Sequence, residues 1–372
     1  MRGVYIHIPF CKKICSYCDF PKQVYNKDFA SDYLESLSKE IETYYEEDTV
    51  KSIYIGGGTP SVLDMEGLTS LFKIIDKFNR TFEAEITFEM NIDDVTEEKI
   101  LFLKSKGVNR ISIGIQSFNK KNQEFLGRKH SKKEIFDRVT LIKRIGIENI
   151  NVDLMYALPN QSLFSLKQDL KQYLKLGVDH ISTYSLIIEP HTRIYIEGVS
   201  NINEELDAKM YEVICKVLSK NGFNHYEVSN FARNKKESEH NLIYWNNEEY
   251  YGFGLGAHGF INDLRYENTK NYTDYISGNY RVEEMFLSTR DDMENEIMLG
   301  LRKLEGINIK KFYEKYGKNI QDEFELGSVV KDGLLVLEGE YLKIPENKIY
   351  VMNEILNRII KWEITFFLLK KC

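Results

Sequence analysis

The chain of 372 residues is two to three times longer than a typical domain, so two domains are expected. Hydrophobic residues make up 42% and charged residues 29%, a balance that excludes a disordered chain. The formal net charge of −7 argues against a protein that binds nucleic acid electrostatically. No apolar run approaches the roughly 18 residues of a membrane helix, and no signal peptide is recognisable. We therefore expect a cytoplasmic protein.

Short β-rich runs alternate with helical patterns from residue 1 to about 230. Predicted strands cover residues 4–8, 52–55, 85–89, 110–115, 151–155 and 181–188. Four glycines at predicted helix ends precede strands: Gly107, Gly146, Gly177 and Gly222. Glycine ends helices readily because it adopts the left-handed conformation at little cost. Six βα units in a row predict a parallel sheet, either open and doubly wound or closed as a barrel.

Several helix starts can also be predicted. Thr96 is a candidate N-cap, and Ser131 with Glu134 fits a capping box, as does Ser165 with Gln168. The helix predicted over residues 28–47 carries one apolar stripe that we expect to be buried: Phe29, Tyr33, Leu37 and Ile41.

The chain divides into three predicted segments. Residues 1–230 form the βα region, residues 231–290 a connecting segment rich in aromatic residues and glycine, and residues 291–372 a small α+β domain. In the connecting segment, Gly254-x-Gly256-x-x-Gly259 matches a dinucleotide fingerprint by its letters, but no helix pattern follows it. We interpret it as a tight packing loop.

Three of the five cysteines lie within eight residues, as Cys11-x-x-x-Cys15-x-x-Cys18. A structural zinc site needs four ligands, usually in two separated pairs, and no second pair exists. Three thiolates on one short loop suit a [4Fe–4S] cluster with one iron left open for a small molecule. A zinc site and a group of free thiols are the weaker alternatives.

Polar residues follow the predicted strands in chain order. Gly56-Gly-Gly-Thr-Pro60 follows the second strand, Glu89 ends the third, Gln116 follows the fourth, and Asp153 lies in the fifth. Barrel enzymes carry their functional groups at the carboxyl ends of the strands, so these residues predict one site. A carboxylate buried there without a partner is costly, so Glu89 and Asp153 need a cation or hydroxyl groups.

The run from Tyr5 to Phe20, Tyr-Ile-His-Ile-Pro-Phe-Cys-Lys-Lys-Ile-Cys-Ser-Tyr-Cys-Asp-Phe, resembles the start of radical S-adenosylmethionine (SAM) proteins. The resemblance is to the branch that contains oxygen-independent coproporphyrinogen III oxidase. It implies a partial (βα)6 TIM-like barrel with a smaller C-terminal α+β domain, and a [4Fe–4S] cluster whose open iron binds SAM. Matching positions imply SAM contacts from ten residues: Tyr5, Tyr17, Gly57, Gly58, Thr59, Glu89, Gln116, Arg128, Asp153 and Ile187.

Two features distinguish relatives within that branch. Phe20 stands where the oxidase has a further cysteine, and His240-Asn-x-x-Tyr244-Trp245 occurs later in the chain. Together they resemble the HemW-type haem chaperones, which implies haem as cargo and a haem-acceptor protein, membrane-associated or soluble, as partner. Imidazole binds haem iron axially and aromatic rings pack along the macrocycle.

The motif therefore predicts His240 as axial ligand and Tyr244 and Trp245 as packing surface, with His225 and His258 as rival ligands. The alternative function is oxidative decarboxylation of coproporphyrinogen III. A weaker third reading is radical chemistry on another substrate.

Overall fold

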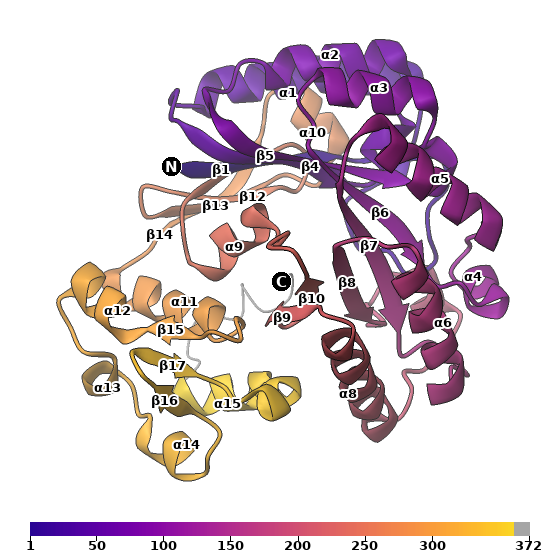
Figure 1. Cartoon of the computed structure of the whole chain (residues 1–372). Helices are drawn as coiled ribbons and strands as arrows, with labels where there is room; N and C mark the ends of the chain where they lie inside the picture. The colour runs from indigo at the N-terminus through magenta and orange to yellow at the C-terminus, as the bar shows by residue number, and fades with distance from the viewer. Residues whose placement is uncertain (361–372) are drawn as a thin grey trace. The chain divides into compact units, whose positions relative to one another are not determined.

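The computed structural model describes residues 1–360 and divides them into two compact units (Figure 1). The first unit contains residues 1–224, 229–243 and 248–286. The second contains residues 225–228, 244–247 and, within the described chain, 287–360. Within the described residues, no helix is both long enough and apolar enough to cross a membrane.

Six parallel strands form the centre of the first unit, in the spatial order β1-β4-β5-β6-β7-β8. They are β1 (Arg2–Ile8), β4 (Val50–Gly57), β5 (Arg80–Asn91), β6 (Arg110–Gln116), β7 (Asn149–Tyr156) and β8 (His180–Ser185). Each strand pairs with the next along the chain, which confirms six successive βα units. The six predicted strands all exist. The first five are longer than predicted, whereas β8 begins one residue earlier and ends at Ser185, so that Ile187 lies beyond it.

Alternate residues of these strands divide the sheet into an apolar and a polar face. Fully buried aliphatic residues such as Ile53, Ile111 and Val152 occupy one face. The residues between them are polar, and their side chains hydrogen-bond across strands, as Asn151 does to Ser112 at 2.9 Å. The helices cover the outer face, as Figure 1 shows for α2, α3, α5 and α6. The inner, concave face is therefore lined by polar side chains.

The helices between residues 1 and 224 are α1 (Lys27–Tyr44), α2 (Met65–Ile75), α3 (Glu97–Ser105), α4 (Lys120–Phe125), α5 (Lys132–Ile145), α6 (Leu163–Lys175), α7 (Arg193–Ile196) and α8 (Glu204–Lys220). Thr96 and Ser131 are the N-caps of α3 and α5 as predicted, although at Ser131 the structure gives only the bond from the Glu134 amide and not the reciprocal bond of a capping box. The capping box predicted for Ser165 with Gln168 was wrong by one turn. Ser162 is the N-cap of α6, and Ser165 is its reciprocal partner. The four predicted glycines all have positive φ.

The predicted stripe on α1 is buried except at its first residue. Tyr33, Leu37 and Ile41 are buried, whereas Phe29 is 49% exposed and packs at 5.6 Å, ring to ring, against Tyr272. Residues spaced by four drift around a helix that has 3.6 residues per turn, so the first residue leaves the face occupied by the last.

The segment 231–290 differs from the predicted connecting region, because its strands extend the central sheet. β11 (Tyr250–Phe253) pairs in parallel with β1, and β12 (His258–Ile261), β13 (Leu264–Asn268) and β14 (Arg281–Phe286) follow it antiparallel. On the other edge, β10 (Asn230–Ala232) pairs antiparallel with β8. The segment also contains α9 (Glu239–Trp245) and α10 (Tyr272–Ile276).

Of the three glycines of the fingerprint pattern in this segment, Gly254 and Gly256 lie in the turn between β11 and β12, and Gly259 lies in β12; β13, rather than a helix, follows them. A Cβ on Gly259 would lie 2.1 Å from the Tyr266 ring, and Gly254 has a φ of +101°. Both positions therefore need glycine for reasons of packing.

The second unit is a small α+β domain, as expected. It contains α11 (Thr289–Gly300), α12 (Ile309–Tyr316), α13 (Ile320–Glu323), α14 (Gly327–Lys331) and α15 (Met352–Ile359). A sheet in the order β15-β17-β16 (Ile307–Asn308, Tyr341–Lys343, Val336–Glu338) packs with them. The last part of the predicted domain, residues 361–372, lies outside the described residues.

Candidate functional site

The three clustered cysteines lie on a loop held at its base by two short strands. β2 (Phe10–Cys11) pairs with β3 (Gln23–Val24), so the chain leaves the barrel at Cys11 and returns beside it. Cys11 is 8% exposed, and Cys15 and Cys18 are partly exposed. Burial raises the pKa of the Cys11 thiol, and the neighbouring thiols of Cys18 and Cys15 raise it further. The three thiols therefore lie close enough to interact electrostatically.

The glycine-rich turn after β4 presses against the start of this loop. A Cβ on Gly58 would lie 2.8 Å from the Phe10 carbonyl oxygen, and one on Gly57 would meet the His7 ring at 2.6 Å. Thr59 donates from its hydroxyl to the Cys11 sulfur at 3.6 Å. The glycines are thus required by the protein's own packing, in addition to any role in admitting a ligand.

The two predicted carboxylates share the polar face of the sheet. Glu89 accepts from the Tyr54 hydroxyl at 2.7 Å and from the Gly57 amide at 3.2 Å. Asp153 accepts from the Asn151 amide at 2.8 Å. Burial raises the pKa of Glu89 to about 7, with the Asp153 charge adding to the effect, and burial raises the pKa of Asp153 to about 6. The site therefore favours a cationic ligand beside these groups.

A positive charge, that of Arg128, and buried polar atoms without hydrogen-bond partners lie near the ends of β5 and β6. Arg128 donates to the Asn91 side-chain oxygen at 2.5 Å, and Asn91 donates to Thr59 at 3.2 Å. Gln116 Oε1 and Arg128 Nε are buried and have no hydrogen-bond partner among the described residues. Buried polar atoms normally have partners, so these two are available to hydrogen-bond a ligand. Gln116 also has a φ of 62°, a strained conformation typical of functional sites.

The remaining predicted SAM contacts line the same end of the barrel. The Tyr5 hydroxyl lies 3.0 Å from His7 Nδ1 on the polar face. Tyr17 interacts with Arg128 and Cys15, and burial raises its pKa. Ile187 is 66% exposed, just beyond β8. Tyr5, Glu89 and Asp153 lie inside β1, β5 and β7, whereas the other seven predicted positions lie at or beyond the carboxyl ends of strands or on the loops that follow them. The contacts of all ten to SAM stay a prediction.

Sequence reasoning missed two members of this site. Asn91 bridges Thr59 and Arg128, and Tyr54 donates to Glu89. The strand period of two could have found both, since Asn91 follows Glu89 by two residues and Tyr54 precedes Gly56 by two.

The His240-Asn-x-x-Tyr244-Trp245 motif lies on α9, and its members differ in their surroundings. His240 is 1% exposed, and its Nδ1 lies 2.8 Å from the Ser52 hydroxyl near the amino end of β4. Tyr244 and Trp245 are assigned to the second unit, where the Arg302 guanidinium lies 5.7 Å from the centre of the Trp245 ring. The iron bond of His240 and the packing role of Tyr244 and Trp245 stay predictions. The burial of His240 favours a structural role.

Comparison with known proteins covers both units. Residues 5–181 match the model of the radical SAM superfamily, and residues 287–350 match the HemN C-terminal domain. The chain is 37% identical to "Heme chaperone HemW" of Lactococcus lactis, over 98% of this chain and 99% of the relative. It is 39% identical to the protein of the same name from Bacillus subtilis, over 95% and 96% of the two chains.

The chain belongs to the HemW family of radical SAM proteins. Its fold also matches the crystal structure of coproporphyrinogen III oxidase (HemN) from Escherichia coli, with a TM-score of 0.84 over 95% of this chain and 89% of that one. The identity is 22%, so this likeness concerns the fold alone. It confirms the partial barrel of radical SAM type with a C-terminal domain.

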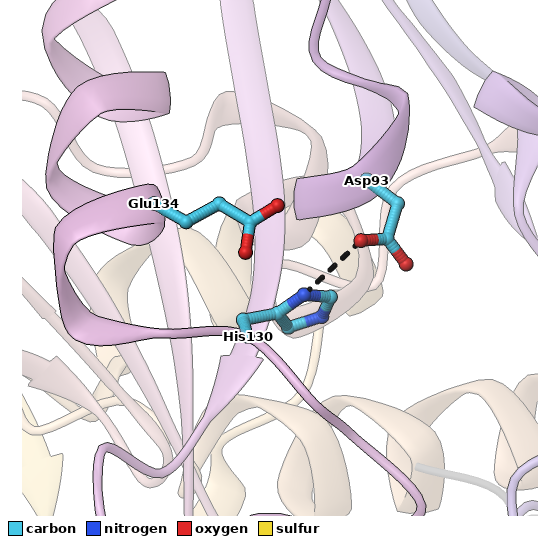
Figure 2. A group of neighbouring side chains, drawn as sticks. All are labelled: Asp93, His130 and Glu134. Atoms are coloured by element: carbon cyan, nitrogen blue, oxygen red, sulfur yellow. Dashed lines mark ion pairs between the residues drawn. The ribbon is translucent and has the colours of Figure 1, made fainter.

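Outside the HemW-type motif and the cluster loop, one further group could hold a cation. Figure 2 shows Asp93, His130 and Glu134, the one set of three such side chains in residues 1–360 whose ligand atoms all lie within 4.8 Å of one another. His130 Nδ1 lies 3.2 Å from Asp93, whose side chain is 61% exposed. Burial lowers the pKa of His130. This geometry equally fits a surface contact that ties the end of β5 to α5.

Proposed function

We propose that the chain is a haem chaperone that carries a [4Fe–4S] cluster and SAM. The observation that carries this proposal is the similarity to named haem chaperones along nearly the whole length of the chain. Phe20 agrees with it, because this side chain offers no thiol beside the cluster loop and is 63% exposed. The cargo would be haem and the partner a haem-acceptor protein, membrane-associated or soluble.

The residues at the carboxyl ends of the strands suit the two cofactors. Cys11, Cys15 and Cys18 would hold the cluster, and three protein ligands leave one iron for SAM. When bound, the cluster and SAM supply one-electron chemistry. SAM carries an ammonium, a sulfonium and a carboxylate. Glu89 and Asp153 would hold its cationic part, and Arg128 would hold its carboxylate.

A single comparison separates chaperone from oxidase. Haem and coproporphyrinogen III would be added separately to anaerobically reconstituted protein with reductant and SAM. We expect about one haem per chain with a shifted Soret band, and no divinyl product from the porphyrinogen. Sustained formation of the divinyl product would support the oxidase instead, and an unchanged haem spectrum would contradict the chaperone proposal.

The axial ligand can be assigned in the same titration. His225 and His240 are almost fully buried, whereas the His258 side chain is 35% exposed and His191 is exposed beyond β8. Exposure therefore favours His258 or His191 over His240. Replacing each of the four by alanine should shift the Soret band in one variant only, and that variant identifies the ligand.

A further inference from the structure

Helix α9 closes the end of the barrel opposite the cysteine loop. Its first amides, on Glu239 and His240, donate to the carboxylate of Glu85 at 3.3 and 3.2 Å. Glu85 lies in the first half of β5 and is 6% exposed. A Cβ on Gly3, near the start of β1, would lie 2.7 Å from the Ile243 side chain. The helix is therefore packed tightly against the amino ends of the strands.

His240 is the residue of this helix whose side chain contacts the polar inner face of the barrel. Its Nδ1 shares a hydrogen bond with Ser52, and burial lowers the pKa of the imidazole to about 3, so the ring is neutral. The ring of Tyr54 lies against it, with 5.2 Å between the centroids and an angle of 32° between the planes. His240 thus forms one wall of the space that holds Tyr54.

Tyr54 connects this wall to the predicted SAM site. Its hydroxyl donates to Glu89 Oε1 at 2.7 Å. Glu89 also accepts from the amide of Gly57, in the turn that presses on the cluster loop. Truncation of His240 would leave the Tyr54 ring beside a void. The ring could then tilt, and its hydroxyl would lose the position that holds Glu89.

A second branch runs from Tyr54 to the cluster loop itself. Tyr54 and Tyr5 lie 6.1 Å apart between centroids, and the Tyr5 hydroxyl lies 3.0 Å from His7 Nδ1. His7 Nε2 lies 2.9 Å from the carbonyl oxygen of Pro21. A carbonyl can only accept, so Nε2 carries the proton and Nδ1 accepts from Tyr5. One continuous column of rings therefore extends from α9 to the loop that carries the cysteines.

We propose that His240 is a positioning residue of the SAM site, which it supports through Tyr54 from the opposite end of the barrel. The histidine of the motif would thereby serve cofactor binding through the order of the barrel interior, while haem finds its iron ligand elsewhere. This inference rests on SAM binding, and the SAM affinities of the variants test it whether or not the chain binds haem.

The test measures SAM affinity in reconstituted full-length protein, by calorimetry and by the change that SAM causes in the spectrum of the reduced cluster. His240→Ala and Tyr54→Phe should each weaken SAM binding, Tyr54→Phe by about tenfold because it removes one hydrogen bond to a charged group. The double variant should lose little more than either single variant, since both act on one contact. His240→Phe keeps a ring beside Tyr54 and should restore most of the affinity.

Two controls make the outcome unambiguous. Glu42→Gln, an exposed change on α1, should leave SAM affinity unchanged, and iron content should be the same in every variant. Phenylalanine cannot bind iron. If His240 is not the haem ligand, the haem spectrum of His240→Phe should match that of the wild type. Wild-type SAM affinity in His240→Ala, or losses that add in the double variant, would overturn the proposal. A changed Soret band in His240→Phe with intact SAM binding would overturn it too, and would assign His240 to the haem.

Discussion

Gln116 has a backbone conformation that β-strands do not favour. It ends β6 with a left-handed backbone, and a buried side-chain oxygen lacks a partner in the described part of the chain. Left-handed conformations cost non-glycine residues about 1–2 kcal/mol, so the fold must hold this one in place. Sequence could place Gln116 at the strand end, but nothing in the letters shows its backbone angle.

If the carboxylates of the site hold SAM as proposed, its binding should depend on pH. Glu89 and Asp153 have pKa values raised to about 7 and about 6, so both are partly protonated in mildly acidic solution. Their ionised forms attract a cationic ligand more strongly. We expect SAM affinity to rise as the pH increases from about 5.5 to 8, and Glu89→Gln to weaken binding and flatten the rise. Calorimetry across this range checks both. A wild-type affinity that is constant with pH would contradict the assignment of Glu89.

At the scale of elements, the sequence predicted which helices and strands exist better than it predicted where they end or which strands pair. Strand periodicity and helix caps located the six βα units, because both depend on neighbouring residues. The capping prediction for α6 failed by one turn because Ser162, Ser165 and Gln168 offer overlapping patterns. The extension of the sheet by β11–β14 was missed, because pairing between β11 and β1 joins residues almost 250 positions apart. The partners of His240 were hidden for the same reason.

Helix α5 provides a direct test of a local prediction that held. The Ser131 hydroxyl oxygen accepts from the Glu134 amide at 3.1 Å, which satisfies one free amide of the first turn. Ser131→Ala should lower the free energy of unfolding by about 1 kcal/mol. Denaturant unfolding measures the change, and Lys133→Ala, an exposed change in the same turn, is the control. Equal stability of Ser131→Ala and the control would show that the cap contributes nothing.

At the scale of the whole molecule, the inner face of the barrel is lined by polar and ionisable side chains, where apolar side chains are usual. Most barrels fill this space with branched apolar residues, whereas here histidine, tyrosine, serine and carboxylate side chains fill it. Buried polar groups add specificity only when their hydrogen bonds are satisfied. The sequence pattern reveals most directly the apolar residues of the strands, whose side chains face the helices. The polar half could be interpreted only after the strands were placed side by side.

One buried carboxylate outside the site affects the stability of the whole first unit. Glu40 of α1 is 1% exposed and accepts from Gly254 and Asn268 of the sheet extension and from Tyr275 of α10. Burial raises its pKa to about 7, above the ordinary value of 4.5. Between these values the folded chain binds more protons than the unfolded chain, so this group's contribution to stability falls as the pH rises.

The buried histidines act in the opposite direction below about pH 6.5, because burial lowers the pKa values of His7 and His240. The contribution of Glu40 must therefore be isolated as a difference between wild type and Glu40→Gln, which keeps the shape but cannot ionise. We expect the wild type to lose stability relative to Glu40→Gln as the pH increases from 5 to 8, measured by denaturant unfolding at each pH. Glu42→Gln, an exposed change on the same helix, is the matched control. A difference that stays constant with pH would mean that Glu40 is ionised throughout, held by its three donors, and that α1 is fixed to the sheet by a charged contact.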